Sequence, residues 1–371
     1  MKKTISAFTV TCLAAMLAAC SAPKEEGFTI DFNLPEGPDC NLYVSEKVPA
    51  SKAWFIDTLK VKGGKAHYEG KVEFPRLMSF HFIKEENIYG SVEMFIDNSQ
   101  GIQINGKKTA DAVITGCKSQ DEYRSAKETM SPAFKQISQS AKTLSEAYRE
   151  KAEKEVIDSL KKVKAEATSA MLDKLMNLPG YATSAVSPFF IYSYCMGNTE
   201  MLEKALSKLD PSMDQNGYVQ EEKAELARQK ASAIGQPAFN FCLKDIEGKE
   251  YKLSDFKGKY VLMEFSASWC GWCKKEIPFL KKVYEENKDQ NFVMFTINLD
   301  ETQKKWEDDV KEMNLPWPVI SDLKAFQGDV PQAFNVKGIP MIYLINPEGK
   351  IEKKGLRGEE MVRTIHDLLR K

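Results

Sequence analysis

The stretch "FSASWCGWCKKEIP", from Phe265 to Pro278, carries the clearest fold signal in the chain. It places Cys270 and Cys273 three positions apart, each directly after a tryptophan, at the end of an apolar run. A close cysteine pair of this kind is half of a metal site, a structural disulfide, or a pair of thiols that exchanges electrons with another molecule. The surrounding sequence distinguishes these three possibilities.

A metal site and a structural disulfide are both disfavoured. A zinc clip takes four ligands, usually two cysteine pairs or one pair with histidines. The three histidines, His67, His81 and His366, lie far from the pair in sequence and show no ligand spacing. A disulfide that closes so short a loop constrains little of the unfolded chain, so it would stabilise the fold only weakly. We therefore expect no metal and no cofactor, and a redox-active pair.

The pair lies in a segment where strands and helices alternate, as they do around a mixed sheet. A loop, "GQPAFNF", opens this segment at Gly235, and a buried strand, "KYVLMEFSA", runs up to the cysteines. A helix is expected from Gly271 to about Asn287. Further strands are expected near 239–243 and 250–253, at "NFVMFTINL", around Val319, at "MIYLIN" and at "KIEKKG", and further helices over about 301–314, 325–334 and 359–370.

The position of the pair at a helix start assigns a role to each sulfur. Unpaired backbone N–H groups and the positive end of the helix dipole stabilise a thiolate there, and only a thiolate attacks a disulfide. Cys270 occupies that position, and Cys273 lies one helical turn later, near enough to displace a bound client and close an intramolecular disulfide. We therefore expect Cys270 to attack and Cys273 to resolve.

Two motifs carry a family resemblance: "WCGWC" directly after an apolar strand, and "GIP" directly before a late strand. With them, residues 235–371 resemble a thioredoxin-fold domain. The opening "GQPAFNF", the lead-in "LSDFKGKYVLMEF" and the insertion containing "TINLDET" are most similar to the envelope-facing thiol-disulfide oxidoreductases typified by TlpA and ResA. The resemblance implies an enzyme that exchanges disulfides with client proteins.

The same resemblance implies a client-binding surface beside the cysteines. In this family the proline at Pro340 follows a cis peptide bond and faces the cysteine pair, so that the backbone of Ile339 pairs with the extended chain of a client. The alternative for Pro340 is an ordinary strand-entry proline. The resemblance also places Trp269, Gly271 and Trp272 at the client surface, although simple packing is the alternative for each tryptophan.

Two acidic residues are further candidates. Glu264 stands on the preceding strand, where thioredoxins carry a buried acid that relays the proton of the resolving cysteine, and burial raises a carboxyl pKa toward neutral pH. Glu301 lies in the insertion, where the ResA-like group places an acid near the active site; an exposed helix surface is an equal alternative, because its neighbours are charged. One departure concerns Trp272, since thioredoxins have proline before the second cysteine. The direction of electron transfer therefore stays open.

Two other segments precede this domain. Residues 27–118 alternate apolar and polar positions between turn signals, which predicts a small antiparallel β-domain. Residues 119–233 show heptad-like apolar spacing and predict a helical linker region that acts as a spacer or dimer arm. Both segments resemble a poorly characterised region that precedes such domains in anchored bacterial lipoproteins. The expected fold class is thus α/β, with a C-terminal thioredoxin fold after a β-domain and a helical segment.

The start of the chain predicts export and anchoring. Two lysines precede an apolar stretch too short to span a bilayer, which indicates a secretory signal over residues 1–19. "LAAC" resembles a bacterial lipobox, so Cys20 would be the lipidated first residue of the mature protein and residues 20–26 a tether. An ordinary signal peptide is the alternative. Ser21 directly after this cysteine resembles lipoproteins that are sorted to an outer membrane, which implies a Gram-negative-type envelope, with the protein facing the periplasm or the surface.

The net charge and the other cysteines limit the possible partners and disulfides. With 52 basic and 53 acidic side chains, the chain has no net field to attract nucleic acid. Four scattered cysteines are expected to be buried small apolar residues, with a Cys40–Cys117 bridge as the alternative; they are Cys40, Cys117, Cys195 and Cys242.

Three functions are therefore open. The first is an anchored thiol-disulfide oxidoreductase that acts as a reductase and is re-reduced by a membrane electron donor. The second is a peroxidase, because peroxiredoxins share the "GQPAFNF" opening; they have Pro and Thr or Ser where this chain has Met263 and Ala267. The third is a partner-binding lipoprotein whose thioredoxin domain is accessory. The client and the oligomeric state stay open.

Overall fold

The computed structural model describes residues 27–46, 56–195 and 197–370. These residues form two compact units, one ending at Tyr123 and the other beginning at Arg124. The predicted signal, tether and lipid-anchor residue Cys20 lie outside the described residues. Within the described part of the chain, no helix is both long and apolar enough to cross a bilayer.

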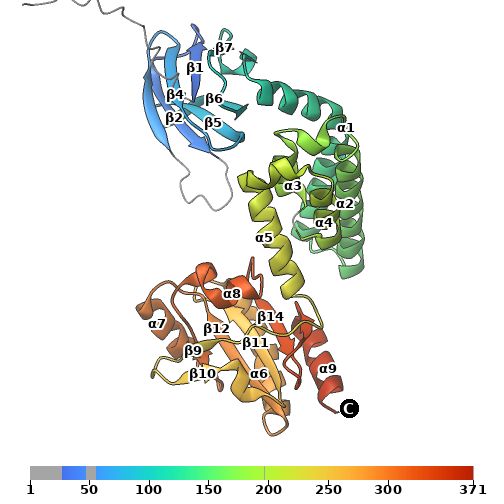
Figure 1. The fold of residues 1–371 in the computed structure, drawn as a ribbon. Coiled ribbons are helices and arrows are strands. Elements are labelled where there is room, and N and C mark those ends of the chain that lie inside the picture. The colour runs from blue at the N-terminus through green and yellow to red at the C-terminus, as the bar shows by residue number, and fades with distance from the viewer. Residues whose placement is uncertain (1–26, 47–55, 196, 371) are drawn as a thin grey trace, which may run out of the picture. The chain divides into compact units, whose positions relative to one another are not determined.

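The first unit contains two four-stranded sheets, with strand orders β4-β1-β7-β8 and β3-β2-β5-β6 (Figure 1, blue). Inward positions alternate with outward ones along β1, so that Phe28, Ile30 and Phe32 are buried in a core shared with both sheets. All strand pairs are antiparallel except β1 with β7, which is parallel. The strands are β1 Phe28–Asn33, β2 Cys40–Glu46, β3 Asp57–Val61, β4 Lys65–Gly70, β5 Arg76–Lys84, β6 Asn87–Ile96, β7 Ile102–Asn105 and β8 Val113–Thr115.

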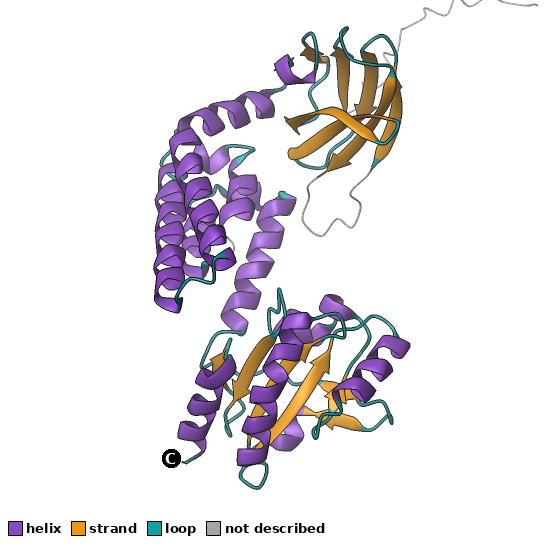
Figure 2. Ribbon diagram, turned by 180° about the vertical axis from the view of Figure 1, so that it is seen from behind, coloured by secondary structure: helices purple, strands orange, loops and turns teal. Residues whose placement is uncertain are grey.

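The described residues of the helical segment form five α-helices (Figure 2). Their core is aromatic: Phe134 stacks on Phe190 and Tyr194, and the fully buried Tyr218 contacts Phe189 and Tyr192. The helices are α1 Lys118–Arg149, α2 Lys154–Leu175, α3 Ser187–Tyr194, α4 Thr199–Ser207 and α5 Gly217–Ala231.

The C-terminal part has the sheet of a thioredoxin fold (Figure 2). Its strand order is β13-β12-β11-β14-β15. The first three strands are parallel to one another, and the last two pairings are antiparallel. A separate hairpin of β9 and β10 precedes it. The elements are β9 Cys242–Lys244, β10 Glu250–Lys252, β11 Tyr260–Ser266, α6 Gly271–Asn287, β12 Phe292–Asn298, α7 Gln303–Met313, β13 Val319–Ile320, α8 Asp329–Ala333, β14 Met341–Ile345, β15 Ile351–Lys354 and α9 Gly358–Leu369.

Two expected elements of this part differ from the structure. The strand expected near 239–243 begins only at Cys242, after an exposed Phe239. The helix expected over 325–334 is broken into a 3₁₀ turn, Ala325–Gln327, and α8. Gly328 separates them because its backbone is extended, and a Cβ there would lie 2.5 Å from the Asp322 carboxylate.

Alternation along β11 divides the side chains between two cores. Leu262 packs on the side that α6 and α9 cover, with Leu280 and Ile365, whereas Met263 and Phe265 pack on the opposite side. Because side chains alternate along a strand, Glu264 faces the same side as Leu262. Glu264 is therefore placed beneath α6, the helix that begins at the cysteine pair.

Candidate active site

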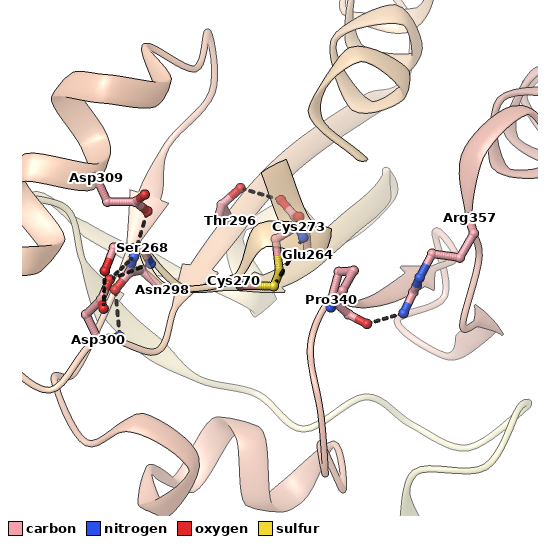
Figure 3. Close-up of a disulfide and its surroundings, with 10 residues drawn as sticks. All are labelled: Glu264, Ser268, Cys270, Cys273, Thr296, Asn298, Asp300, Asp309, Pro340 and Arg357. Atoms are coloured by element: carbon pink, nitrogen blue, oxygen red, sulfur yellow. Dashed lines mark hydrogen bonds between the residues drawn. A yellow bond between two sulfur atoms is a disulfide. The ribbon is translucent and has the colours of Figure 1, made fainter. Parts of the chain in front are cut away.

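Cys270 and Cys273 form a disulfide at the start of α6, with an S–S length of 2.01 Å (Figure 3). Cys270 is the N-cap residue of this helix, and its sulfur accepts a hydrogen bond from the Cys273 N–H at 3.1 Å. Backbone N–H groups at a helix start point outward and carry partial positive charge. After reduction, the same N–H group and the helix dipole favour the thiolate of Cys270.

The rim around the disulfide is aromatic and exposed, whereas the sulfurs are buried. Cys270 is 5% exposed and Cys273 1%, but Trp269 is 58% and Trp272 71% exposed. Gly271 between them is exposed, and a Cβ there would meet no atom within 4 Å. The approach to Cys270 is therefore open at Gly271 and flanked by two apolar rings.

The Ile339–Pro340 peptide bond is cis, as the family resemblance implies. Among the described residues, the backbone of Ile339 has no hydrogen-bond partner, so its N–H and C=O are available to another chain. The carbonyl of Pro340, by contrast, accepts a hydrogen bond from the Arg357 guanidinium (Figure 3). Arg357 thus holds one side of this peptide segment while Ile339 stays unpaired.

Glu264 is buried on β11, with 2% of its surface exposed (Figure 3). Its Oε2 accepts a hydrogen bond from the Thr296 hydroxyl at 3.2 Å, and the indole of Trp317 donates to that hydroxyl at 2.9 Å. Its Oε1 has no partner among the described residues. Burial raises the pKa of Glu264 to about 8, against the lowering effects of the Thr296 hydrogen bond and the Arg357 charge. The carboxyl is therefore mostly protonated at neutral pH and can exchange a proton near pH 8.

A buried polar cluster holds the loop before Cys270. The backbone N–H and the hydroxyl of Ser268 donate to the two oxygens of Asp300, at 3.0 and 2.7 Å (Figure 3). Asn298 donates to Asp300 and to Asp309, both at 3.0 Å. Burial, and then the charge of Asp300, raise the pKa of Asp309 to about 6. Because Ser268 precedes Cys270 by two residues, this cluster holds the loop that leads to the cysteine.

The sequence singled out Glu301 in this insertion, but the acid that contacts the cysteine loop is its neighbour. Glu301 is exposed, directly before the N-cap residue of α7, whereas Asp300 is 1% exposed. A signal for Asp300 was available: β11 and β12 are parallel, so the residues that follow their carboxyl ends, Ser268 and Asp300, meet at one edge of the sheet.

Glu276 and Arg357 were also missed. Glu276 lies on α6, and its carboxylate accepts the Gly358 N–H at 2.8 Å, which joins the starts of α6 and α9. Burial lowers the pKa of Arg357, and the nearby charges of Glu276 and Glu264 oppose that effect. No local sequence signal marks either residue, because Glu276 contacts Gly358, 82 positions away, and Arg357 contacts Pro340, 17 positions away.

The four other cysteines within the described residues carry free thiols. Cys40, Cys117 and Cys195 are buried as expected, and Cys40 and Cys117 are not bridged. The expectation of burial was wrong for Cys242, which lies outward on the short strand β9. Burial raises the pKa of Cys117 to about 11 and that of Cys195 to about 12, so both are neutral and unreactive near pH 7.

Comparison with known proteins matches separate parts of the chain. Residues 234–354 match the AhpC/TSA family, and residues 28–123 match a domain of unknown function, DUF4369. Thiol-disulfide oxidoreductase ResA of Bacillus thuringiensis is 32% identical over 157 residues, which cover 42% of this chain and 84% of ResA. ResA of Bacillus subtilis is 34% identical over 149 residues, covering 40% of this chain and 82% of ResA.

Solved structures match the same C-terminal part. The thioredoxin domain of a thiol-disulfide oxidoreductase from Bacteroides vulgatus is 35% identical, covering 37% of this chain and 98% of that domain, with a TM-score of 0.36. A thiol-disulfide oxidoreductase from Bacteroides fragilis is 28% identical, covering 36% of this chain and all of that chain, with a TM-score of 0.35. On the sequence matches and the site, this chain belongs to the TlpA/ResA-like thiol-disulfide oxidoreductases, through its C-terminal thioredoxin-fold domain.

Proposed function

We propose that this enzyme reduces disulfides in client proteins through Cys270 and Cys273. In the reduced enzyme, the Cys270 thiolate attacks a client disulfide, which forms a mixed disulfide and releases one client thiolate that takes up a proton. Cys273 then loses its proton and attacks the Cys270 sulfur, which releases the second client thiol and forms the Cys270–Cys273 disulfide. Two electrons pass to the client, and a membrane dithiol donor returns two to the enzyme.

The observation that carries this proposal is a disulfide at a helix start, with a buried acid of raised pKa beneath the helix. Glu264 would accept the proton that Cys273 loses. The unpaired backbone of Ile339 would pair with the extended client chain, as an added strand does. Trp269 and Trp272 would supply the apolar contact.

Two remaining site candidates have smaller roles in this proposal. Gly271 leaves room for the client beside Cys270. Glu301 is exposed, so it would act on a docked client and not on the buried sulfurs.

The peroxidase alternative has no support from the site. Met263 is fully buried and Ala267 is 2% exposed, and neither supplies a hydroxyl to orient a peroxide. The reaction proposed here uses only a client disulfide and a dithiol donor. We propose that the enzyme reduces its clients and does not oxidise them. Measuring the reduction potential of the Cys270–Cys273 pair against glutathione tests this direction.

We also propose the location and the division of the chain. Residues 1–19 would be removed, and Cys20 would carry lipid at the outer membrane, with residues 20–26 as a tether and 27–118, 119–233 and 235–371 as the three functional parts. Several acyl chains on one residue hold a protein to a bilayer, since each buried methylene contributes about 0.8 kcal/mol.

We expect Cys20→Ala to move the protein from the membrane to the soluble fraction of lysed cells. Unchanged membrane association would contradict the anchor.

A covalent trap tests the proposed reaction. We expect Cys273→Ser to accumulate disulfide-linked complexes with clients, because Cys270 still attacks but nothing resolves the mixed disulfide. The complexes should disappear when a reducing agent is added before electrophoresis, and the Cys270→Ser/Cys273→Ser protein should form none. Partners that are captured equally by the double variant would favour a non-covalent binding protein instead.

A further inference from the structure

Glu225 on α5 connects the helical segment to the catalytic part of the same compact unit. Its Oε1 accepts a hydrogen bond from the Asn335 side-chain amide, and its Oε2 pairs with the Lys337 ammonium, both at 2.9 Å. Within α5, Gln229 donates to Oε1 and Arg228 to Oε2, again at 2.9 Å. Both carboxylate oxygens therefore have one partner on α5 and one on the catalytic part.

The two catalytic-part partners of Glu225 stand shortly before the client-binding residues. Asn335 has a left-handed backbone conformation, with φ of 49°, directly after Phe334, the C-cap residue of α8. Val336 is 3% exposed and packs into the core on one side of the sheet. Lys337 follows, and Gly338 then leads to Ile339 and the cis Pro340. The segment is thus held from the core by Val336 and from α5 by Glu225.

The environment of Glu225 strengthens these contacts. Its side chain is only 15% exposed. Burial raises the pKa of Glu225, but the side chains that donate hydrogen bonds to it outweigh this effect and lower its pKa to about 2. Glu225 therefore stays ionised at neutral pH. An isolated surface ion pair contributes little to stability, whereas a half-buried carboxylate with several donors makes stronger, charge-assisted hydrogen bonds.

We propose that Glu225 is a positioning residue for client binding. It holds Asn335 and Lys337, and through them it keeps the backbone of Ile339 where a client chain can pair with it. Helix α5 is then part of the client site, although it lies before the thioredoxin fold in sequence. This inference rests on the proposed disulfide exchange, but it concerns KM for protein clients and not the chemistry of the two sulfurs.

The test compares Glu225→Ala with Glu221→Ala in the full chain, each with the helical segment present. Glu221 is the matched control, because it pairs with Arg228 on the same helix and not with Asn335 or Lys337. With insulin as the client, we expect Glu225→Ala to raise KM roughly threefold to tenfold and to leave kcat within about twofold, as loss of a binding contact does. Glu221→Ala should match the parent.

Four further measurements separate positioning from general destabilisation. With a small aromatic disulfide, which needs no backbone pairing, Glu225→Ala should react at the parental rate, and the reduction potential of the cysteine pair should not move. Amide hydrogen exchange at 335–341 should become faster in Glu225→Ala only. Lys337→Met should reproduce part of the KM effect, and the Glu225→Ala/Lys337→Met protein should be no worse than Glu225→Ala alone.

Each possible failure has a distinct meaning. If the parent protein reduces insulin but Glu225→Ala and Glu221→Ala have the same KM, Glu225 has no positioning role. If Glu225→Ala slows the small disulfide as much as it slows insulin, the effect lies in the sulfurs and the inference is wrong. If the parent itself reduces neither substrate, it is the proposed function that fails, while the hydrogen-exchange comparison still tests the contact.

Discussion

Replacing Cys270 by serine is expected to remove client disulfide reduction almost completely. Cys270 provides the only cysteine sulfur at the N-terminus of α6 that can begin the exchange, since Cys273 is 1% exposed. A serine hydroxyl at that position is not a nucleophile toward sulfur. We expect the rate of insulin reduction with a thiol donor to fall by three or more orders of magnitude, on the order of the loss seen when other enzymes lose a covalent nucleophile.

A suitable control for this variant is Cys242→Ser, which removes an exposed free thiol on β9. We expect Cys242→Ser to keep the parental rate, because β9 lies in the hairpin outside the central sheet. Thermal unfolding of both proteins should show that each is folded. A Cys270→Ser protein as active as its parent would refute the assignment of the nucleophile.

Replacing Glu264 by glutamine should have the second largest effect. Glutamine has nearly the same shape but takes no proton, so Cys273 would lose the nearby base that assists its deprotonation. General acid-base assistance of this kind contributes about a hundredfold or more, so we expect the resolving step to slow by about that factor. The measurement is single-turnover release of the second client thiol from a preformed mixed disulfide.

The pH dependence of Glu264→Gln should also differ. In the parent, the Glu264 pKa of about 8 means that the carboxylate becomes available as the pH rises through 8, so the resolving rate rises there. In Glu264→Gln that rise should be absent, leaving only the titration of the thiols. Glu286→Gln is the control, because Glu286 is an exposed glutamate on α6. A parent profile without any change near pH 8 would contradict the role of Glu264.

Stability gives an independent check with a definite sign. The pKa of Glu264 is higher in the folded protein than the ordinary glutamate value of 4.5, so the folded state binds more protons between those two values. The free energy of unfolding is therefore not reduced by Glu264 at low pH. The reduction begins as the pH rises above about 4.5 and is complete above the folded pKa of about 8. Each tenfold difference in proton affinity between the folded and unfolded states corresponds to about 1.4 kcal/mol. In denaturant unfolding, Glu264→Gln should therefore gain stability relative to its parent more at pH 9 than at pH 5.

Features that depend on neighbouring positions were predictable from the sequence. The helix after the cysteines begins at Gly271 and ends at Asn287, as its apolar spacing indicates. The cis bond before Pro340 and the burial of Glu264 also agree with expectation, because a strand-helix order and a short motif determine both. The prediction of one continuous helix over 325–334 was wrong, because the helix is interrupted at Gly328. Apolar spacing cannot show that a Cβ at this position would lie too close to the Asp322 carboxylate.

Features that depend on distant partners were not predictable from one sequence. Glu301 and Asp300 are adjacent acids, and only the pairing of β11 with β12 shows which one meets Ser268. Glu225 was part of a helical stretch interpreted as a spacer, and its partner Lys337 lies in another segment of the chain. The antiparallel pattern expected for residues 27–118 contains one parallel pair, β1 with β7, because strands so far apart in the chain need no hairpin.

The buried thiols of Cys117 and Cys195 have a consequence for a catalyst of this kind. An enzyme that breaks and forms disulfides in other proteins could also form incorrect disulfides between its own cysteines. Cys117 and Cys195 are buried, and their raised pKa values keep both thiols neutral. Neither thiol can therefore compete with Cys270 for a bound client. Burial therefore removes these two thiols from the exchange reaction in the folded protein, whereas Cys242 stays exposed.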